Sequence, residues 1–456
     1  MVIGGGLAGC EAAWQMAERG ISLDLFEMRP GTQTPAHQTG WLAELVCSNS
    51  LKSDQPTTAS GLLKRELRLL DSLILRVAEE VSVPAGSALA VDRQRFAAQI
   101  THVLSEHPRI RVLREEIRDL PQDIPLVLAS GPLTSKALSE AVQSFLGQEN
   151  LSFYDAIAPL IASESIDRQK VFVGSRYEKG EPAYLNCPLN KSEYMLFYRQ
   201  LVAAETAPER SFERGLFFEG CVPVEELARR GPRTLLFGPM RSVGLTDPRR
   251  RKRPYAVVQL RQDNSAGTIY NMVGFQTRLR RGKQREVFRL IPGLERAEFL
   301  RYGSVHRNTF LCAPRVLEPT LQIRGHETMF VAGQLVGGEG YVESMATGLM
   351  AGLNLARVLQ ERKPVVAPVT SLLGSLCQYI AESDADHFQP MNVNFGLLPP
   401  LNRAPKSKDK RKQMLAQRAL RDLSAWRDME EIGKGAHYRE NGQEVLNLSG
   451  FGEKLL

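Results

Sequence analysis

Hydrophobic positions in the first third of the chain alternate between short apolar runs and longer stretches with helical spacing. An apolar stub, Met1–Ile3, and a run at Ile21–Phe26 predict two strands, and Cys10–Arg19 between them predicts a helix. Ala59–Val81 is predicted as one long amphipathic helix with leucines on one face, and Leu126–Gly131 as a strand that ends in a glycine turn. Strands that alternate with helices in this way are typical of a parallel sheet covered by helices.

The pattern changes from about residue 168 to residue 302, where short strands, aromatic residues and turns surround a predicted helix at Lys191–Glu205. The first pattern then returns, with a predicted strand at Glu327–Ala332 and a helix of small residues at Val342–Leu359. We therefore expect an α/β fold in which a discontinuous Rossmann-like domain of the glutathione-reductase type contains a smaller inserted α+β domain.

The domain boundaries follow from these changes of pattern. Residues 1–165 and 306–426 are assigned to the discontinuous domain, and residues 166–305 to the insert. Lys406–Trp426 is predicted as a basic amphipathic helix, with its apolar positions at helical spacing: Leu415, Ala419, Leu420, Leu423 and Trp426. Residues 427–456 are polar and glycine-rich, and we expect them to be a disordered tail.

The glycine-rich loop after the first strand has the spacing of a dinucleotide-binding motif. Gly4, Gly6 and Gly9 form G-x-G-x-x-G between a strand and a helix, and Glu27 ends the second strand. In such units the glycines permit a tight turn and close approach of a pyrophosphate, and the acid binds a ribose hydroxyl. A plain glycine turn is the alternative. The predicted contacts are Gly4, Gly5, Gly6, Leu7, Ala8, Gly9, Glu27 and Arg29.

The first strand is shorter than is usual before such a loop. Either the natural start lies upstream or the strand itself is truncated, and we expect the first.

A second glycine-rich turn lies between the predicted strand at 327–332 and the helix at 342–359. Two such turns far apart in the sequence indicate that distant segments hold the two ends of one ligand, as in discontinuous flavin-binding domains. The predicted cofactor is therefore FAD. Gly333, Gln334 and Tyr341 are the candidate contacts of this turn, with Tyr341 placed to stack on a flavin or pterin ring unless it is a core tyrosine.

Composition narrows the class of protein. The 456 residues exceed what one hydrophobic core can organise. No apolar run reaches 18 residues, and no charged-then-apolar leader precedes the glycine loop, so we expect a cytoplasmic protein without a membrane partner. The six cysteines are scattered without a C-x-x-C pair, which argues against a structural zinc site or a paired-thiol redox centre. No metal is expected.

Positive charge is concentrated in the predicted insert. Residues 166–305 hold 26 basic and 15 acidic residues, whereas the rest of the chain is slightly acidic, within an overall net charge of +7. The basic runs at 249–253 and 278–285 fit a polyanion-binding surface, although a solvated loop carries similar charge.

Several longer motifs carry a family resemblance. They are VIGGGLAGCEAAWQMAERG with EMRP, VCSNSLKS, FEGCVPVEEL, RPYAVVQLRQDN, MVGFQT, HRNTF and AGQLVGGEGYVESMATGLMAG. Together they resemble the folate- and FAD-dependent tRNA (uracil-5-)-methyltransferase family, from the first residue to about Trp426. The departures are the short first strand, the tail, and a more basic run at 249–253.

The resemblance implies an activity. Such enzymes form 5-methyluridine at position 54 of the tRNA T-loop, taking a methylene from 5,10-methylenetetrahydrofolate through N5 of FAD and reducing it with NAD(P)H. The expected partners are therefore the T-arm of tRNA, a folate and a nicotinamide cofactor, and no DNA.

The resemblance also nominates residues. Cys47 and Cys221 are the expected catalytic thiols: one attacks C6 of uracil, and the other acts as acid/base or protects the methylene-bearing flavin, with the division of roles left open. His306, Arg307 and Asn308 contact the flavin or folate, or else anchor their loop. Arg250 and Arg251 are expected to bind RNA phosphates.

Three other functions are alternatives to this activity. A wobble-uridine-modifying flavoprotein shares the FAD fold but carries a large helical C-terminal domain, for which the roughly 30 residues after Trp426 are too few. A small-molecule flavin oxidoreductase would show a C-x-x-C pair or a second complete nucleotide motif, and neither is present. A flavin-bearing RNA-binding regulator would tolerate loss of Cys47 and Cys221.

Overall fold

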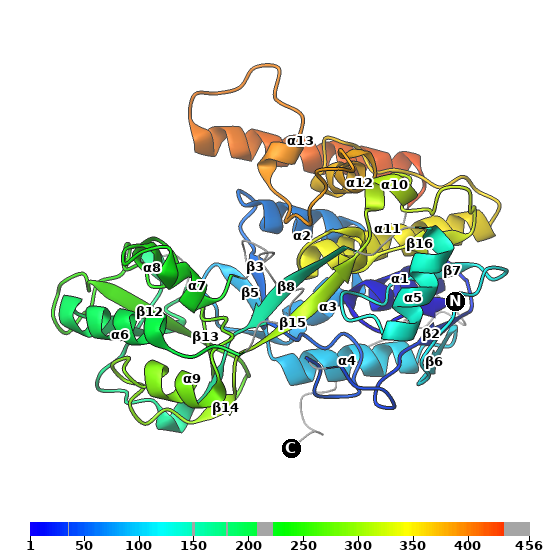
Figure 1. The fold of residues 1–456 in the computed structure, drawn as a ribbon. Coiled ribbons are helices and arrows are strands. Elements are labelled where there is room, and N and C mark those ends of the chain that lie inside the picture. The colour runs from blue at the N-terminus through cyan, green and yellow to red at the C-terminus, as the bar shows by residue number, and fades with distance from the viewer. Residues whose placement is uncertain (35, 148–150, 179–180, 208–221, 433–456) are drawn as a thin grey trace.

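A computed structural model describes residues 1–34, 36–147, 151–178, 181–207 and 222–432, with only the backbone for 151–156 and 305–307. The chain forms two lobes joined by a two-stranded connection (Figure 1). The parallel-sheet lobe contains both ends of the described chain, and the insert lobe contains the middle. Each lobe has its own hydrophobic core, one built from residues 2–142 and 310–432 and the other from residues 161–299.

The parallel-sheet lobe is built on a five-stranded sheet in the order β16-β7-β1-β2-β6. Every neighbouring pair is parallel. In chain order the strands are β1 (Val2–Ile3), β2 (Leu23–Phe26), β6 (Ile110–Leu113), β7 (Leu126–Leu128) and β16 (Met329–Val331). Because β16 comes from the far side of the insert, the sheet is discontinuous in sequence, and the predicted fold class is confirmed.

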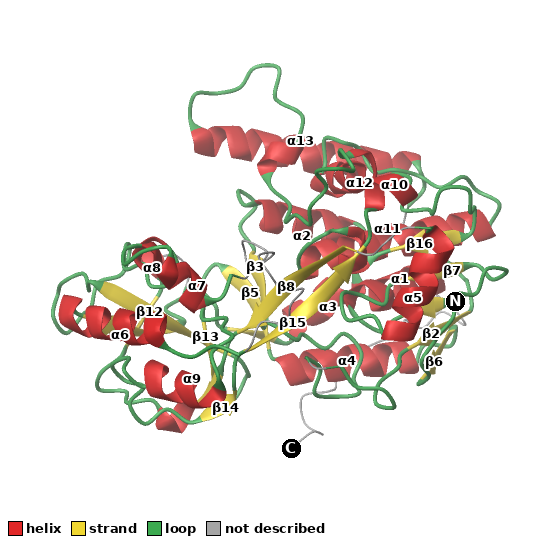
Figure 2. Ribbon diagram, viewed as in Figure 1, coloured by secondary structure: helices red, strands yellow, loops and turns green. Residues whose placement is uncertain are grey.

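Helices pack around this sheet and on one another (Figure 2). The helices of the lobe are α1 (Leu7–Ala17), α2 (Ala59–Leu69), α3 (Leu73–Glu80), α4 (Arg93–Ser105), α5 (Lys136–Leu146), α10 (Ala313–Val316), α11 (Tyr341–Leu359), α12 (Leu372–Glu382) and α13 (Lys408–Met429). A small antiparallel sheet of β3 (Ser50–Ser53), β5 (Ala88–Val91) and β4 (Ser82–Val83) lies beside them.

The helix predicted over Ala59–Val81 is two helices. Asp71 adopts the left-handed conformation (φ 56°), and the Ser72 side chain accepts a hydrogen bond from the backbone of Leu75 to start α3. A left-handed residue ends helical geometry, and a serine cap begins it again. The prediction failed because the leucine spacing continues through the break.

The insert lobe is a six-stranded antiparallel sheet in the order β10-β11-β12-β13-β9-β14. Its strands are β9 (Leu160–Ala162), β10 (Phe172–Gly174), β11 (Tyr184–Leu189), β12 (Ala256–Gln262), β13 (Ile269–Met272) and β14 (Phe299–Arg301). Its helices are α6 (Lys191–Ala203), α7 (Val224–Arg229), α8 (Thr234–Phe237) and α9 (Arg281–Phe288). This sheet already includes residues 160–162, which precede the expected boundary at 166.

The antiparallel pair β8 (Leu151–Ile157) and β15 (Ser304–Phe310) connects the lobes (Figure 1). At the other end of the chain, α13 continues past Trp426 to Met429, and Ile432 is buried, so ordered structure extends into the segment expected to be a tail. The rest of that segment, 433–456, lies outside the described residues. Among the described helices, none combines the length and the apolar character that crossing a bilayer requires.

Candidate functional site

The three glycines of the G-x-G-x-x-G motif at the start of α1 have different structural roles. Gly4 has φ 106°, and a Cβ there would lie 2.4 Å from the carbonyl oxygen of Ala129. A Cβ on Gly9 would lie 1.8 Å from the carbonyl oxygen of Gly4, so that glycine lets α1 pack against the loop. A Cβ on Gly6, by contrast, would meet no protein atom within 4 Å. Gly4 and Gly9 are needed for packing, and Gly6 leaves space for a ligand.

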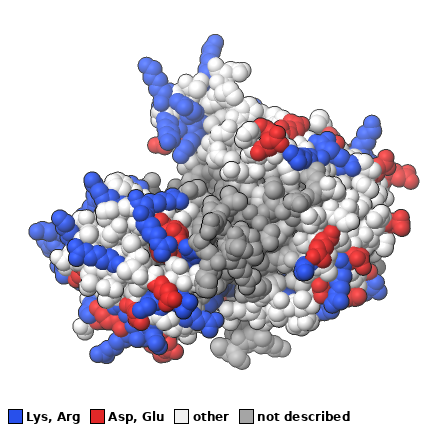
Figure 3. Space-filling model, in the orientation of Figure 1, with Lys and Arg blue, Asp and Glu red and all other residues white. Residues whose placement is uncertain are grey.

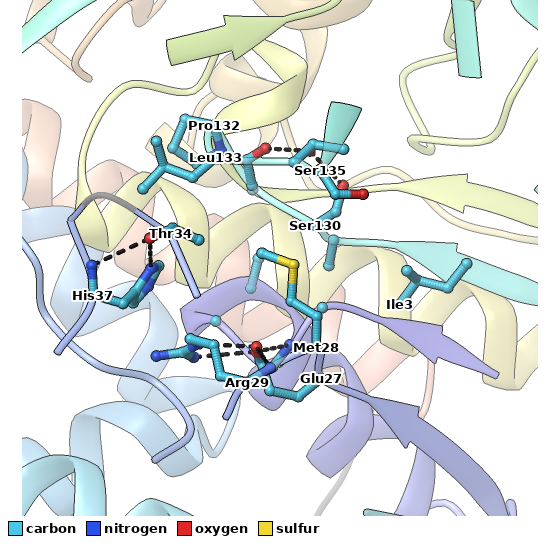
Figure 4. Close-up of a pocket in the computed structure, with 18 of the residues that line it drawn as sticks. Ile3, Glu27, Met28, Arg29, Thr34, His37, Ser130, Pro132, Leu133 and Ser135 are labelled. Atoms are coloured by element: carbon cyan, nitrogen blue, oxygen red, sulfur yellow. Dashed lines mark hydrogen bonds and ion pairs between the residues drawn. The ribbon is translucent and has the colours of Figure 1, made fainter. Parts of the chain in front are cut away.

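A cavity opens at this loop (Figure 4). Its empty space is about 990 Å³, including the part open to solvent, and it is lined by Gly4–Ala8, by the end of β2 and by the turn 129–135 after β7. The N-terminus of α1 has no side-chain cap, so its first N–H groups are available to an anion. An uncapped buried helix start beside open space fits the pyrophosphate of a dinucleotide.

Glu27 and Arg29 form an ion pair on one side of this cavity, facing Ser130 and Pro132 across it (Figure 4). Glu27 Oε2 accepts a hydrogen bond from the N–H of Gly5 (3.0 Å), and the Arg29 guanidinium donates to both Glu27 oxygens (2.9 and 3.1 Å). Burial acts to raise the pKa of Glu27, but the hydrogen bonds and charge of Arg29 outweigh it and hold that pKa below its ordinary value. Glu27 is therefore an ionised acceptor suited to a ribose hydroxyl.

Arg29 serves mainly to hold acidic groups. Besides Glu27, its guanidinium donates to Glu44 (3.1 Å), and the side chain is almost completely buried. It also lines the cavity, so the predicted contact of Arg29 with a ligand stays a prediction.

The second glycine-rich turn lies on the same cavity. Gly333 (φ 83°), Gln334 and Tyr341 all line it. The turn is brought there by close packing of α1 on α11, where Cβ atoms on Gly348 and Gly352 would come within 2.5 Å of the carbonyl oxygens of Ala8 and Ala12. Two segments more than 300 residues apart thus meet at one cavity, as the two glycine-rich turns predicted.

Cys47 lies next to the cavity wall. The preceding residue, Val46, lines the cavity, and Tyr341 Oη accepts hydrogen bonds from the N–H groups of Cys47 (2.8 Å) and Ser48 (3.2 Å). Burial, and next the proximity of Cys47, raise the pKa of Tyr341, so its hydroxyl keeps its proton and acts as a neutral hydrogen-bonding group. We call residues 45–49 the Cys47 loop.

Two arginines hold the carbonyl groups of the Cys47 loop. Arg93 of α4 donates to the carbonyl oxygens of Leu45 (2.9 Å) and Cys47 (3.3 Å). Arg301 of β14 donates to those of Val46 (3.1 Å) and Cys47 (3.3 Å). Burial, and next the charge of Arg93, lower the pKa of Arg301 to about 10, which still leaves it cationic near neutral pH. Two arginine side chains from different lobes therefore fix the backbone of the thiol-bearing loop.

The insert lobe also contacts this loop through β12. Arg261 donates to Asn49 Oδ1 (2.9 Å) and to Ser48 Oγ (2.6 Å), and Asn49 Nδ2 donates to the carbonyl of Gln262 (2.9 Å). Asp263, which follows β12, pairs with Arg93 at 2.8 Å. The Cys47 loop is therefore held at the seam between the lobes by residues of both.

The remaining predicted residues lie in three places. His306, Arg307 and Asn308 belong to β15 of the connection, where only the side chain of Asn308 is described. This side chain is 1% exposed, and neither its amide oxygen nor its amide nitrogen has a hydrogen-bond partner among the described residues. A side chain that anchors its loop would have such a partner. Arg250 and Arg251 are exposed on the insert lobe, and Arg250 lines a cavity separate from that of the glycine loop. Cys221 lies outside the described residues.

The other cysteines behave as packing residues. Cys10, Cys187, Cys312 and Cys377 are buried, and burial raises the pKa of each thiol. The described residues contain no group of histidine, cysteine and acidic side chains that could hold a metal ion.

Sequence reasoning missed the residues that hold the Cys47 loop: Arg93, Arg261, Asp263 and Arg301. Arg261 and Asp263 fall within the motif RPYAVVQLRQDN, but nothing in their spacing indicated that they contact residues 48 and 93.

The chain is similar to known proteins both in sequence and in fold. The family model described as "Glucose inhibited division protein A" matches residues 1–363. A methylenetetrahydrofolate–tRNA-(uracil-5-)-methyltransferase TrmFO from Halalkalibacterium halodurans is 57% identical over 92% of this chain and 97% of its own length. The TrmFO of Moorella thermoacetica is 56% identical over 92% and 96%. The solved structure of Aquifex aeolicus GidA has a TM-score of 0.64 at 15% identity, covering 94% of this chain and 74% of that one, a likeness of fold.

Proposed function

This chain belongs to the methylenetetrahydrofolate–tRNA-(uracil-5-)-methyltransferase family, and on that premise we propose that it forms 5-methyluridine at position 54 of the tRNA T-loop. The one-carbon unit comes from 5,10-methylenetetrahydrofolate and the reducing equivalents from NAD(P)H. The observation that carries the proposal is the position of the Cys47 loop, which borders the cavity of the glycine loop and is held by both lobes.

The residues of the cavity fit FAD. The open space at Gly6 and the uncapped start of α1 suit a pyrophosphate, and the ionised Glu27 suits a ribose. Gly333, Gln334 and Tyr341 line the same cavity, which supports our assignment of them to the other end of the molecule. When bound, FAD supplies a carrier atom, N5, for the methylene and the hydride that reduces it to a methyl group.

The thiols supply the activation that uracil lacks. A thiolate that adds to C6 pushes electron density to C5, which then forms the new carbon–carbon bond. The C5 proton is then removed as the one-carbon unit leaves its carrier, which gives an exocyclic methylene at C5. Hydride addition to that methylene forms the methyl group and expels the sulfur from C6, which restores the C5–C6 double bond. Cys47 and Cys221 are the two candidates, one as nucleophile and one as acid/base or as protector of the one-carbon unit. Arg93 and Arg301 fix the backbone on which Cys47 is carried.

The substrates are assigned to different surfaces. The buried amide of Asn308 has no hydrogen-bond partner among the described residues, which supports our assignment of it, with its neighbours His306 and Arg307, to contacts with the flavin or the folate. Arg250 and Arg251 are exposed, and we assign them to the phosphates of the T-arm. Since the substrate is tRNA, we place the enzyme in the cytoplasm.

The experiment is an assay on the purified yellow protein. It is incubated with unmodified tRNA, methylenetetrahydrofolate and NADPH, without S-adenosylmethionine, and nuclease digests are searched for 5-methyluridine. Its appearance at position 54, and its absence when folate is left out, is the expected result. Failure to form it with flavin-loaded protein and intact tRNA would refute the proposal.

A further inference from the structure

The segment that leads into α13 carries an unusual density of positive charge. Residues 403–412, here called the α13 basic segment, contain six cations and one acid, Asp409. The six cations are Arg403, Lys406, Lys408, Lys410, Arg411 and Lys412. Five of them are exposed, and Lys412, half-buried, lies over the ring of Phe395 at 6.0 Å.

These cations have no acidic partners within the described chain. None of the six takes part in an ion pair among the described residues, whereas Arg421 and Arg427 farther along α13 each pair with the following aspartate at 2.8 Å. Like charges one turn apart destabilise a helix, and cations at a helix start oppose its dipole. Ser407 caps the helix and Asp409 lies in its first turn, but no described acidic side chain pairs with any of the six cations, which indicates an anionic partner outside the lobe.

The helix that carries the segment is packed firmly against the parallel-sheet lobe. Leu415, Ala419 and Leu423 of α13 are buried in the core of the parallel-sheet lobe. Arg418 donates to the carbonyls of Pro399 (2.5 Å) and Pro400 (3.1 Å), which fixes the chain just before the segment. Because the apolar face of α13 is already buried, the helix cannot insert that face into a lipid surface, as an interfacial helix would. A phosphate backbone needs only the exposed cations.

The α13 basic segment lies on the same face of the molecule as the basic side chains of the insert lobe. The start of α13 projects beyond the body of the parallel-sheet lobe on the side where the insert lobe lies (Figure 1). In the same orientation, basic side chains gather both on this projection and on the insert lobe, on either side of the region between them (Figure 3). A ligand that crosses from one lobe to the other at this face would meet positive charge at both ends.

We propose that the α13 basic segment is a second tRNA-binding surface, which binds backbone phosphates while the insert lobe holds the T-arm. This inference rests on the proposed function for the identity of the RNA. It adds an anchor on the parallel-sheet lobe, so that the tRNA spans the seam at which Cys47 is held.

The test is the variant Lys406→Gln/Lys408→Gln/Lys410→Gln/Arg411→Gln in the full-length holoenzyme. A matched control removes four exposed cations elsewhere on the same lobe: Arg111→Gln/Arg118→Gln/Lys136→Gln/Lys363→Gln. Binding of unmodified tRNA is measured between 50 and 300 mM salt, with flavin content as the check of folding. The Kd of the segment variant should rise about tenfold, and the slope of log K against log salt should fall by about 3, since each lost phosphate contact removes about 0.7–0.9.

The control variant should change the Kd for tRNA less than about twofold, because salt screens the attraction between the RNA and cations that do not contact it. Wild-type affinity and slope in the segment variant would overturn the inference. So would unchanged tRNA binding together with loss of binding to anionic lipid vesicles. Failure of the proposed function would show differently, as wild-type protein that binds tRNA without forming 5-methyluridine.

Discussion

The cavity of the glycine loop and the basic surface of the insert lobe represent two ways of building a binding site. In the cavity, recognition depends on backbone: Gly4 and Gly9 permit close packing, and Gly6 leaves room beside uncapped helical amides. On the insert lobe, exposed side chains such as Arg250 and Arg251 offer charge without a fixed shape. A small rigid ligand requires defined backbone geometry, whereas a large polyanion requires mainly distributed charge. The two sites should therefore fail independently when mutated.

The largest effect is expected at the seam between these regions. Cys47→Ser and Cys221→Ser should each lower the rate of 5-methyluridine formation by at least about 10²-fold, because a hydroxyl replaces the thiol that we propose to be catalytic. Flavin content and tRNA affinity should remain those of wild type. Cys187→Ala, which changes a buried thiol of the insert core, is the control and should retain methylation. A Cys47 variant with more than a tenth of wild-type activity would contradict the role of that thiol.

The next effect isolates the cavity. Gly6→Val should fold, because a Cβ at this position meets no protein atom within 4 Å, but should retain about a tenth or less of the flavin, because the side chain fills the space for the pyrophosphate. Absorbance near 450 nm relative to 280 nm measures the flavin, and circular dichroism measures folding. Gly9→Val, where the backbone of Gly4 blocks the side chain, should instead misfold. Full flavin content in Gly6→Val would disprove the assignment of the cavity.

Charge reversal tests the other region. Arg250→Glu/Arg251→Glu should weaken tRNA binding about tenfold or more at moderate salt, since two attractive phosphate contacts become repulsive. Flavin content should not change. The binding is measured by filter retention of labelled tRNA, with Lys136→Glu/Lys363→Glu as the control for net charge. Unaltered affinity for tRNA would show that these two arginines do not bind the RNA.

A smaller effect is expected where α11 supports the Cys47 loop. Tyr341→Phe removes the acceptor of two half-buried backbone N–H groups, and an unpaired donor costs at most about 1–3 kcal/mol. Methylation should fall about tenfold while flavin is retained. Tyr379→Phe, which removes only a hydrogen bond to the carbonyl of Gln389, is the matched control. Equal effects of the two substitutions would show that the loop does not depend on Tyr341.

The smallest effect concerns stability and pH. Lys64 of α2 is fully buried and donates to the carbonyls of Leu51 (2.8 Å) and Ser53 (2.7 Å), and burial lowers its pKa from 10.5 to about 8. Between these values the unfolded chain binds a proton that the folded chain does not, so the contribution of Lys64 to stability rises with pH. The difference in unfolding free energy between wild type and Lys64→Met should therefore shift by about 2 kcal/mol in favour of wild type between pH 7.5 and 9.5.

Urea denaturation at the two pH values measures this shift. The same difference at both would mean that the lysine titrates normally.

The cavity could be predicted from the sequence, whereas the support of the Cys47 loop could not. The glycine spacing, Glu27 and the turn at Gly333 follow local rules of strand, turn and helix, so the cavity could be predicted from them. The support of the Cys47 loop could not, because Arg93, Arg261 and Arg301 reach it from distant elements through contacts that no local pattern encodes. The break between α2 and α3 was missed for a related reason, since one left-handed residue at Asp71 overrides the continuing leucine spacing.

The central claim is that a folate-derived carbon reaches uracil at the seam beside Cys47. The most direct measurement is the mass of the 5-methyluridine formed when the methylene of the folate carries carbon-13 and the methyl group of added S-adenosylmethionine carries deuterium. The account predicts a product with the carbon-13 label and without the deuterated methyl group. A product labelled only from S-adenosylmethionine would contradict it.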